Sequence, residues 1–173
     1  MLASLKEWPV KMVTNTAEEQ EWNARLLDTR MMLSSIKKHA HSSDSAVACQ
    51  FEGQPVGLAL ISVSGELEAH EDLDHSKGVV VDYLVTHPGT TGVGGALIEQ
   101  IVNTSNESGL EGRVQLSQVS TSGKAAYLAL GFVEEGGLKM TLTPSAEHNQ
   151  DRWTQQDGQW RLKKYASKPL LAT

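Results

Sequence analysis

The alternation of hydrophobic and polar residues divides the chain into helical and strand-like segments. After residue 16 the apolar positions recur at helical spacing, which predicts a helix at about 17–38 with one buried face. These positions are Trp22, Leu26, Leu27, Met31, Met32 and Ile36. Thr16 followed by Glu19 is typical of a capping box, so we expect the Thr16 side chain to cap this helix.

Strand-like patterns surround this helix and continue after it. Residues 10–13 predict a short first strand, and AVACQFE and PVGLALISV predict an antiparallel hairpin turning at Gly53 and Gln54. The nearly continuous apolar run in GVVVDYLVTHP predicts a central strand that is buried on both faces. A helical pattern at 94–107 and the strand-like RVQLSQV at 113–119 complete a βαβ unit.

The later part of the chain predicts one short helix and short strands. A helix at 122–130 should end at Gly131, because glycine readily adopts the left-handed conformation that follows a helix. FVEE and LKMTLTP then predict two further strands.

A hairpin is also expected near the C-terminus. Asp157 and Gly158 separate two Trp-bearing runs, a pattern typical of a type I′ turn. We expect Trp153 and Trp160 to face each other across this hairpin, where they either cap the core or form a dimer contact.

Composition narrows the class of protein. The length of 173 residues suits one domain, and 39% hydrophobic residues suit a globular protein. The net charge of −6 predicts that the protein does not bind nucleic acid. Cys49 is the only cysteine of the sequence, so no intrachain disulfide is possible and a reducing cytoplasm is expected. The opening residues lack the apolar core of a signal peptide, and no stretch reaches the roughly 20 apolar residues of a membrane span, so no membrane partner is predicted.

The glycine-rich stretch THPGTTGVGGALIEQ, at 86–100, follows the predicted central strand directly. A P-loop would need a lysine, and none occurs between Gly78 and Lys124. A dinucleotide fingerprint would need a third glycine where Leu97 stands. Two interpretations stay open: a loop that holds a pyrophosphate by backbone N–H groups at a helix start, and a turn that only joins strand to helix.

This stretch resembles the acetyl-coenzyme A motif of the GNAT superfamily of acetyltransferases. In that motif a strand ending L-x-V-x-P leads to [Q/R]-x-x-G-x-[G/A] and a helix; here Leu84, Thr86 and Pro88 occupy the strand end. The six-residue pattern is occupied by Gly89, Thr90, Thr91, Gly92, Val93 and Gly94. Gly89 stands where the family usually has Gln or Arg, and the stretch between Pro88 and Gly92 is shorter than is common.

A second stretch, SGKAAYLALGF, resembles the family's Y-x-x-x-G-F signature, with Tyr127, Gly131 and Phe132 in the matching places. The order of predicted elements from 8 to 144 also follows the family. The resemblance implies an α/β GNAT fold at 8–144, with a mixed central sheet flanked by helices. It leaves 145–173 as a C-terminal extension packed on that domain and carrying the extra hairpin.

The resemblance implies an N-acetyltransferase that moves an acetyl group from acetyl-CoA to a primary amine of a small molecule, protein or peptide. The chain would act as a monomer or homodimer. A non-catalytic GNAT-like module that binds acyl-CoA or a partner is the alternative, because of Gly89 and the shorter loop. The residues implied to hold acetyl-CoA are Leu84, Val85, Thr86, Gly89, Thr90, Thr91, Gly92, Val93, Gly94, Gly95 and Ser120.

Two side chains are implied to act in catalysis. Tyr127 resembles the family's general acid, which gives a proton to the leaving thiolate; the alternative is a tyrosine that only packs the short helix. Asp82 lies where relatives place a carboxylate that takes the proton of the amine, and the alternative is a buried acid with satisfied hydrogen bonds. Ser120 is equally suited to capping the following helix, and His87 is expected only to border the loop.

The acidic segment between the second and third strands is implied to lie near the acceptor side, where its charge attracts a cationic amine. It contains Glu66, Glu68, Glu71, Asp72 and Asp74. A solvated loop is the alternative. His70 and His75 flank this segment without the spacing of zinc ligands, so no metal site is predicted.

Overall fold

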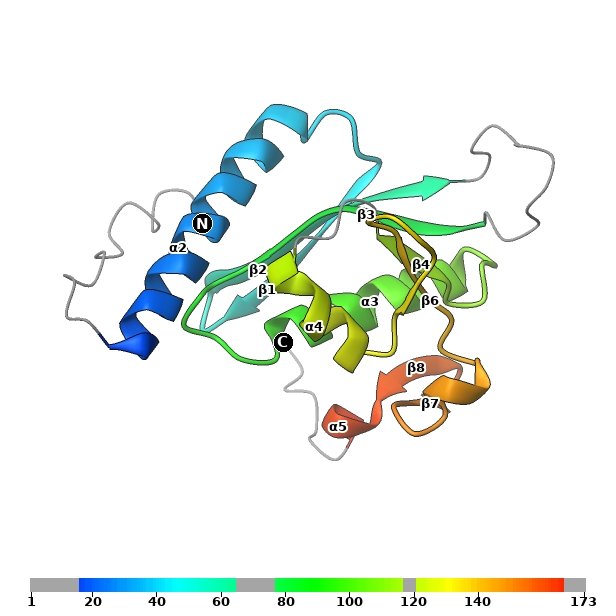
Figure 1. The fold of residues 1–173 in the computed structure, drawn as a ribbon. Coiled ribbons are helices and arrows are strands. Elements are labelled where there is room, and N and C mark those ends of the chain that lie inside the picture. The colour runs from blue at the N-terminus through cyan, green and yellow to red at the C-terminus, as the bar shows by residue number, and fades with distance from the viewer. Residues whose placement is uncertain (1–15, 65–76, 117–120, 167–173) are drawn as a thin grey trace. The chain divides into compact units, whose positions relative to one another are not determined.

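In the computed structural model the described residues are 16–64, 77–116 and 121–166 (Figure 1). They form a six-stranded sheet of order β1-β2-β3-β4-β6-β5 and a separate two-stranded sheet β7-β8. The predicted fold class, a mixed sheet with helices and an extra C-terminal hairpin, is confirmed. The chain groups into two units, one of Met1–Ile61 with Asp82–Leu97 and one of Ser62–Val81 with Ile98–Thr173.

The first unit contains α2 (Ala17–His39), which agrees closely with the predicted helix. Thr16 is the N-cap residue, as predicted, but the expected capping hydrogen bond of its side chain is absent. Instead the Thr16 carbonyl accepts hydrogen bonds from the backbone amides of Glu19 and Gln20, at 3.1 and 3.2 Å.

The buried face of α2 is narrower than the sequence pattern suggested. Leu26, Leu33 and Ile36 are buried, whereas Leu27 and Met31 are 59% and 62% exposed. At 3.6 residues per turn, the two exposed residues lie on the opposite side of the helix from the three buried ones. Leu33 and Ile36 pack with Leu60 and Val85, and this cluster forms the core of the first unit.

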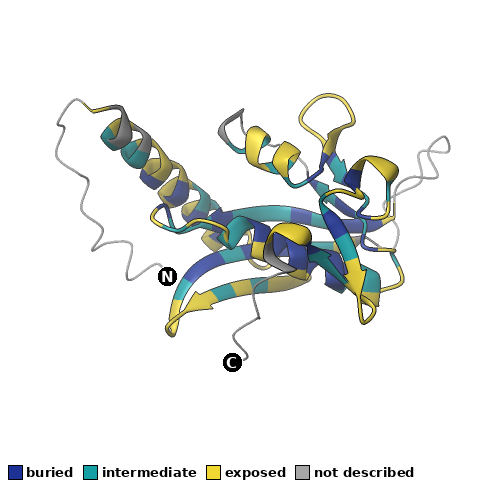
Figure 2. Cartoon of the chain, turned by 90° about the horizontal axis from the view of Figure 1, so that it is seen from below, coloured by how far each residue is buried: buried dark blue, intermediate teal, exposed yellow. Residues whose placement is uncertain are grey.

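Strands β1 (Ser45–Phe51) and β2 (Gln54–Ser64) pair in antiparallel fashion. Their turn is at Glu52 and Gly53, one residue earlier than predicted, and both have positive φ (50° and 74°), as a type I′ turn requires. Figure 2 shows a largely exposed β1 beside the more buried β2.

Strand β3 (Gly78–Thr86) and helix α3 (Val93–Glu107) run through both units. No residue of β3 is exposed, which confirms the predicted central strand. β4 (Val114–Leu116) pairs in parallel with β3 through Val79–Val81, so the predicted βαβ unit is confirmed.

The second unit also contains α4 (Thr121–Ala129), β5 (Val133–Glu134) and β6 (Met140–Leu142). Helix α4 ends in a Schellman motif: the Gly131 amide donates to the Leu128 carbonyl, and the Phe132 amide to the Tyr127 carbonyl. Gly131 has φ 96°, so the predicted role of this glycine in ending the helix is confirmed.

The C-terminal hairpin consists of β7 (Trp153–Gln156) and β8 (Gln159–Leu162), preceded by the 3-10 helix η1 (Glu147–Asn149) and followed by α5 (Lys163–Ala166). The Asp157-Gly158 turn has the predicted type I′ conformation. Trp153 pairs with Leu162 and not with Trp160, so that prediction is wrong. A two-residue turn fixes the register at Gln156 opposite Gln159, which excludes a Trp153–Trp160 pair.

Polar side chains of α3 hold this hairpin. The Asn103 side chain accepts from the Trp160 amide at 2.7 Å and donates to the Trp160 carbonyl at 3.0 Å, as a neighbouring strand would. Glu99 accepts from the Arg161 guanidinium at 3.0 Å and from the Leu162 amide at 2.8 Å. The hairpin therefore packs on α3, while the division of the chain at residue 145 stays a prediction.

Candidate functional site

The end of β3 offers an edge of extended backbone. Val85 points into the core of the first unit, and Leu84 and Thr86 are half-buried. The register with β4 ends at Val81, and no strand of the described ranges pairs with that edge of β3 beyond it. In general, strand backbone without a neighbouring strand can bind an extended ligand as an added strand.

His87 anchors the loop that follows. Its amide donates to the Val56 carbonyl at 2.7 Å, and its own carbonyl accepts from the Thr90 amide and hydroxyl at 3.0 and 2.8 Å. The Gly89 amide donates to His87 Nδ1 at 3.0 Å. Burial lowers the pKa of His87, which favours the neutral ring that can accept this bond. From the sequence, His87 was expected only to border the loop. The signal for its role was the spacing of two residues between a histidine, whose ring can accept a hydrogen bond, and Gly89, whose amide donates it.

Two aromatic rings lie close to Gly89. A Cβ placed there would lie 3.2 Å from both the His87 ring and the Trp22 ring, tighter than an ordinary contact. The position where the resemblance expects Gln or Arg is therefore closed to a side chain unless these rings move.

Three backbone amides at the start of α3 make no helical hydrogen bond. Gly92 turns the chain with φ 86°, and the Ala96 amide makes the first helical hydrogen bond, to the Gly92 carbonyl. The amides of Val93, Gly94 and Gly95 have no acceptor within the described part of the chain. These donors and the positive end of the helix dipole together favour an anion.

Gly94 differs from Gly89 in its surroundings. A Cβ built on it would meet only the Thr86 methyl group, at 3.9 Å, so no atom of the described residues requires a glycine there. By contrast, a Cβ on Gly57 of β2 would lie 2.5 Å from Val93 Cγ1 and 3.0 Å from Leu97 Cδ1. Gly57, which the sequence interpretation missed, thus lets the first turn of α3 approach β2.

Asp82 lies on β3, before the strand end. Its carboxylate accepts a hydrogen bond from the Ser43 hydroxyl at 2.8 Å, and its side chain is half-buried. Asp82 and the residues from Leu84 to Gly95 all belong to the first unit.

Tyr127 belongs to the second unit and lies on α4. Its ring contacts the Phe132 ring edge to face, with centroids 5.5 Å apart. Burial raises the pKa of the phenol above its ordinary value, so the hydroxyl stays protonated at neutral pH. This hydroxyl has no hydrogen-bond partner in the part of the chain that the structure describes.

Several predicted residues lie outside the described residues. They are Ser120, His70, His75 and the acidic residues from Glu66 to Asp74. Within the described ranges, no group of three or more His, Cys, Asp or Glu side chains is placed to hold a metal ion. None of the described helices has both the length and the apolar character that a membrane crossing needs.

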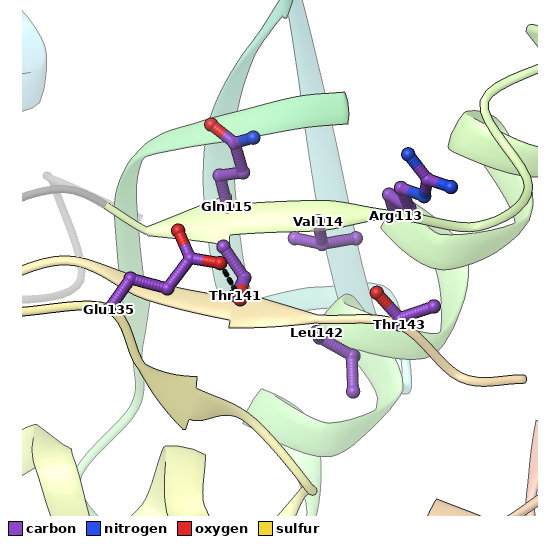
Figure 3. A pocket seen from close by; sticks show the side chains of 7 residues that line it. All are labelled: Arg113, Val114, Gln115, Glu135, Thr141, Leu142 and Thr143. Carbon is purple, nitrogen blue, oxygen red and sulfur yellow. Dashed lines mark hydrogen bonds between the residues drawn. The ribbon is translucent and has the colours of Figure 1, made fainter. Parts of the chain in front are cut away.

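The second unit also has a hollow of about 350 Å³ over β4 and β6. Figure 3 shows Glu135 beside Thr141, whose hydroxyl donates to the Glu135 carboxylate at 2.7 Å. The other lining residues are Arg113, Val114, Gln115, Leu142 and Thr143. None of them was predicted as a site residue.

Comparison with known proteins gives matches among solved structures. Neither a protein-family model nor a curated protein matches this sequence. The ribosomal-protein-S18-alanine N-acetyltransferase of Escherichia coli is 19% identical, with a TM-score of 0.47, over 64% of this chain and 77% of that one. An aminoglycoside N-acetyltransferase in complex with CoA is 17% identical, with a TM-score of 0.47, over 66% and 87%. A structure from Desulfovibrio desulfuricans, described as GNAT-family, is 14% identical, with a TM-score of 0.47, over 81% and 88%.

These similar structures are N-acetyltransferases or members of the GNAT family, the superfamily that the two sequence motifs resemble. The identities are low, so the function proposed below rests on the residues of this chain.

Proposed function

We propose that this protein is an acetyl-CoA-dependent N-acetyltransferase. It transfers the acetyl group to a primary amine of a small molecule, or to an amine of a protein or peptide. The observation that carries this proposal is that a Cβ at Gly94 would meet no atom of the described residues closer than 3.9 Å. Glycine in the first turn of a helix costs about 0.5–1 kcal/mol relative to alanine. No contact of the described residues requires that cost, so we attribute it to a ligand that approaches the backbone closely.

The cofactor site consists of two parts of the first unit. The free amides of Val93, Gly94 and Gly95 bind the pyrophosphate, and Gly92 directs the chain into the helix. Gly89, Thr90 and Thr91 form the wall of the loop, fixed by the bonds at His87. The backbone of Leu84, Val85 and Thr86 binds the pantetheine arm, and Ser120 is proposed as a further contact.

Two side chains handle protons in this proposal. The acetyl thioester supplies the acyl group, and the amine attacks its carbonyl carbon as the carbon–sulfur bond breaks. Asp82 accepts the proton that the amine loses, with the Ser43 hydroxyl holding its carboxylate in place. Tyr127 donates its phenolic proton to the departing thiolate, and burial supports this role because it keeps the phenol protonated.

The alternative, a module that binds acyl-CoA without turnover, is favoured by one observation. The Gly89 amide is already bonded to His87, and its position cannot easily take a side chain, so the shorter loop offers a phosphate fewer contacts than the family pattern does. Binding without transfer would identify this alternative. The preference for a cationic acceptor, which depends on the acidic segment at 66–74, stays a prediction.

A thermal-shift titration tests cofactor binding. Acetyl-CoA and free CoA should each raise the melting temperature in a saturating manner, and NAD should not. Ligand at about 100 times its Kd adds roughly 2.7 kcal/mol of stability, which is readily detected in a domain of this size. No shift with millimolar acetyl-CoA would overturn both the enzyme and the acyl-CoA-binding alternative.

A further inference from the structure

The segment after β6 returns to the C-terminal end of α4, within the second unit. Asn149 is fully buried, and its side-chain amide donates to the Gly131 carbonyl at 3.1 Å and to the Thr143 carbonyl at 3.0 Å. Trp153 is 2% exposed, and its indole N–H donates to the Leu130 carbonyl at 2.9 Å. Two side chains of the C-terminal extension thus bind the two carbonyls just beyond α4.

These carbonyls belong to the turn that ends the helix of Tyr127. In this turn the Leu130 and Phe132 amides both donate to the Tyr127 carbonyl, at 3.0 and 3.1 Å. The Phe132 ring packs against the Tyr127 ring. Two amides of the turn therefore donate to the carbonyl of Tyr127. Two carbonyls of the turn accept hydrogen bonds from the Asn149 and Trp153 side chains.

Gly131 connects this turn to the extension. A Cβ at Gly131 would overlap the Asn149 side-chain carbonyl, and the positive φ already disfavours a side chain. The glycine of the Y-x-x-x-G-F signature therefore leaves room in this chain for the Asn149 amide.

The length of α4 makes these external bonds important. A helix of nine residues is too short to be stable in isolation, so its position depends on tertiary contacts. The carbonyls at its end would otherwise need water or another donor.

We propose that Asn149 and Trp153 are positioning residues, which fix the end of α4 and thereby the orientation of the Tyr127 phenol. This inference deepens the proposed function and rests on it for the catalytic meaning of Tyr127. The C-terminal extension is then part of the apparatus that orients the general acid.

The chain offers a matched pair of variants. Trp153→Phe keeps a buried aromatic ring and removes the N–H that binds the Leu130 carbonyl. Trp160→Phe makes the same change on β8, where the indole N–H has no acceptor in the described part of the chain. The two variants lose the same group, but only the first loses a hydrogen bond.

The experiment labels the full-length protein with 3-fluorotyrosine and follows the three ¹⁹F signals, assigned with single Tyr→Phe variants, during a pH titration. We expect Trp153→Phe to shift the Tyr127 signal and to move its pKa back toward the value of an exposed tyrosine. Trp160→Phe should leave both unchanged. Melting curves show whether each variant is folded. If Trp153→Phe is unfolded, Asn149→Ser replaces it, because it keeps a small polar side chain and removes the amide group that donates to the Gly131 carbonyl.

A folded Trp153→Phe protein with the wild-type Tyr127 signal and pKa would overturn the positioning role, as would an equal change in Trp160→Phe. Adding free CoA to the labelled wild-type protein tests the proposed function separately. If CoA does not change the Tyr127 signal, the role of Tyr127 in thiolate protonation fails, whereas the comparison of the two Trp variants still decides whether the extension orients the phenol.

Discussion

Tyr127 is the residue whose chemistry depends most on its surroundings. Its phenol is half-buried against Phe132, and burial raises its pKa by disfavouring the charged phenolate. A general acid must be protonated when the thiolate leaves. The fold therefore keeps Tyr127 protonated across the neutral range, as the proposed role of general acid requires.

The raised pKa predicts a stability loss at high pH. Because the folded-state pKa lies above the unfolded value of about 10, the contribution of the neutral phenol is complete below that pH. It is lost as the pH rises through the folded-state pKa. Melting temperatures measured from pH 9 upward should fall more steeply for the wild-type protein than for Tyr127→Phe. Equal slopes would contradict the burial of this phenol.

At the residue scale the sequence suggests chemical roles, which stay predictions, but not the contacts of the side chains. Asp82 and Tyr127 were selected by a resemblance of motifs, and the structure adds the Ser43 hydroxyl and the Phe132 ring as their partners. The Asp82–Ser43 contact joins residues 39 positions apart, so no local pattern indicates it.

At the scale of elements, the glycines between β3 and α3 differ in what surrounds them. A Cβ at Gly89 would lie close to the His87 and Trp22 rings, whereas a Cβ at Gly94 would meet only the Thr86 methyl group, at 3.9 Å. The sequence shows four glycines in one stretch without separating these cases. Only the positions of neighbouring atoms distinguish packing from room for a ligand.

This distinction predicts the outcome of a substitution in α3. Gly94→Val should weaken acetyl-CoA binding by at least about tenfold, because a side chain blocks close approach to the backbone amides. Its melting temperature without ligand should not fall, since valine has a higher helix propensity than glycine. Isothermal titration calorimetry with acetyl-CoA measures the affinity.

Ala96→Val is the control, because it places a valine at an exposed position of the same helical turn. It should bind acetyl-CoA like the wild-type protein. Wild-type affinity in Gly94→Val would contradict the proposed site at the start of α3.

Helix α2 shows why element boundaries were easier to predict than buried faces. The predicted range 17–38 differs from Ala17–His39 by one residue. The list of apolar positions nevertheless included Leu27 and Met31, which are exposed. An apolar residue costs little at the surface, so its presence in a periodic pattern does not show that it is buried.

At the scale of the whole molecule, the C-terminal extension connects elements that lie far apart in the sequence. Its hairpin bonds to α3 through Asn103 and Glu99, and its Trp153 bonds to the end of α4. The sequence predicted the hairpin and its turn from Asp157-Gly158. The predicted Trp153–Trp160 pair was wrong because the turn fixes a different register.

The central claim is that the protein transfers an acetyl group to an amine. The most direct measurement is the release of free CoA from acetyl-CoA in the presence of spermidine, a lysine peptide, or a neutral or anionic amine, with mass spectrometry of the acetylated product. We predict release above the acceptor-free background with at least one primary amine, and a rate about 10²-fold lower for Tyr127→Phe with little change in acetyl-CoA affinity. If the protein binds acetyl-CoA but releases no CoA with any of these amines, the enzyme proposal is contradicted and the non-catalytic module is favoured. If Tyr127→Phe keeps full activity, Tyr127 is not the general acid.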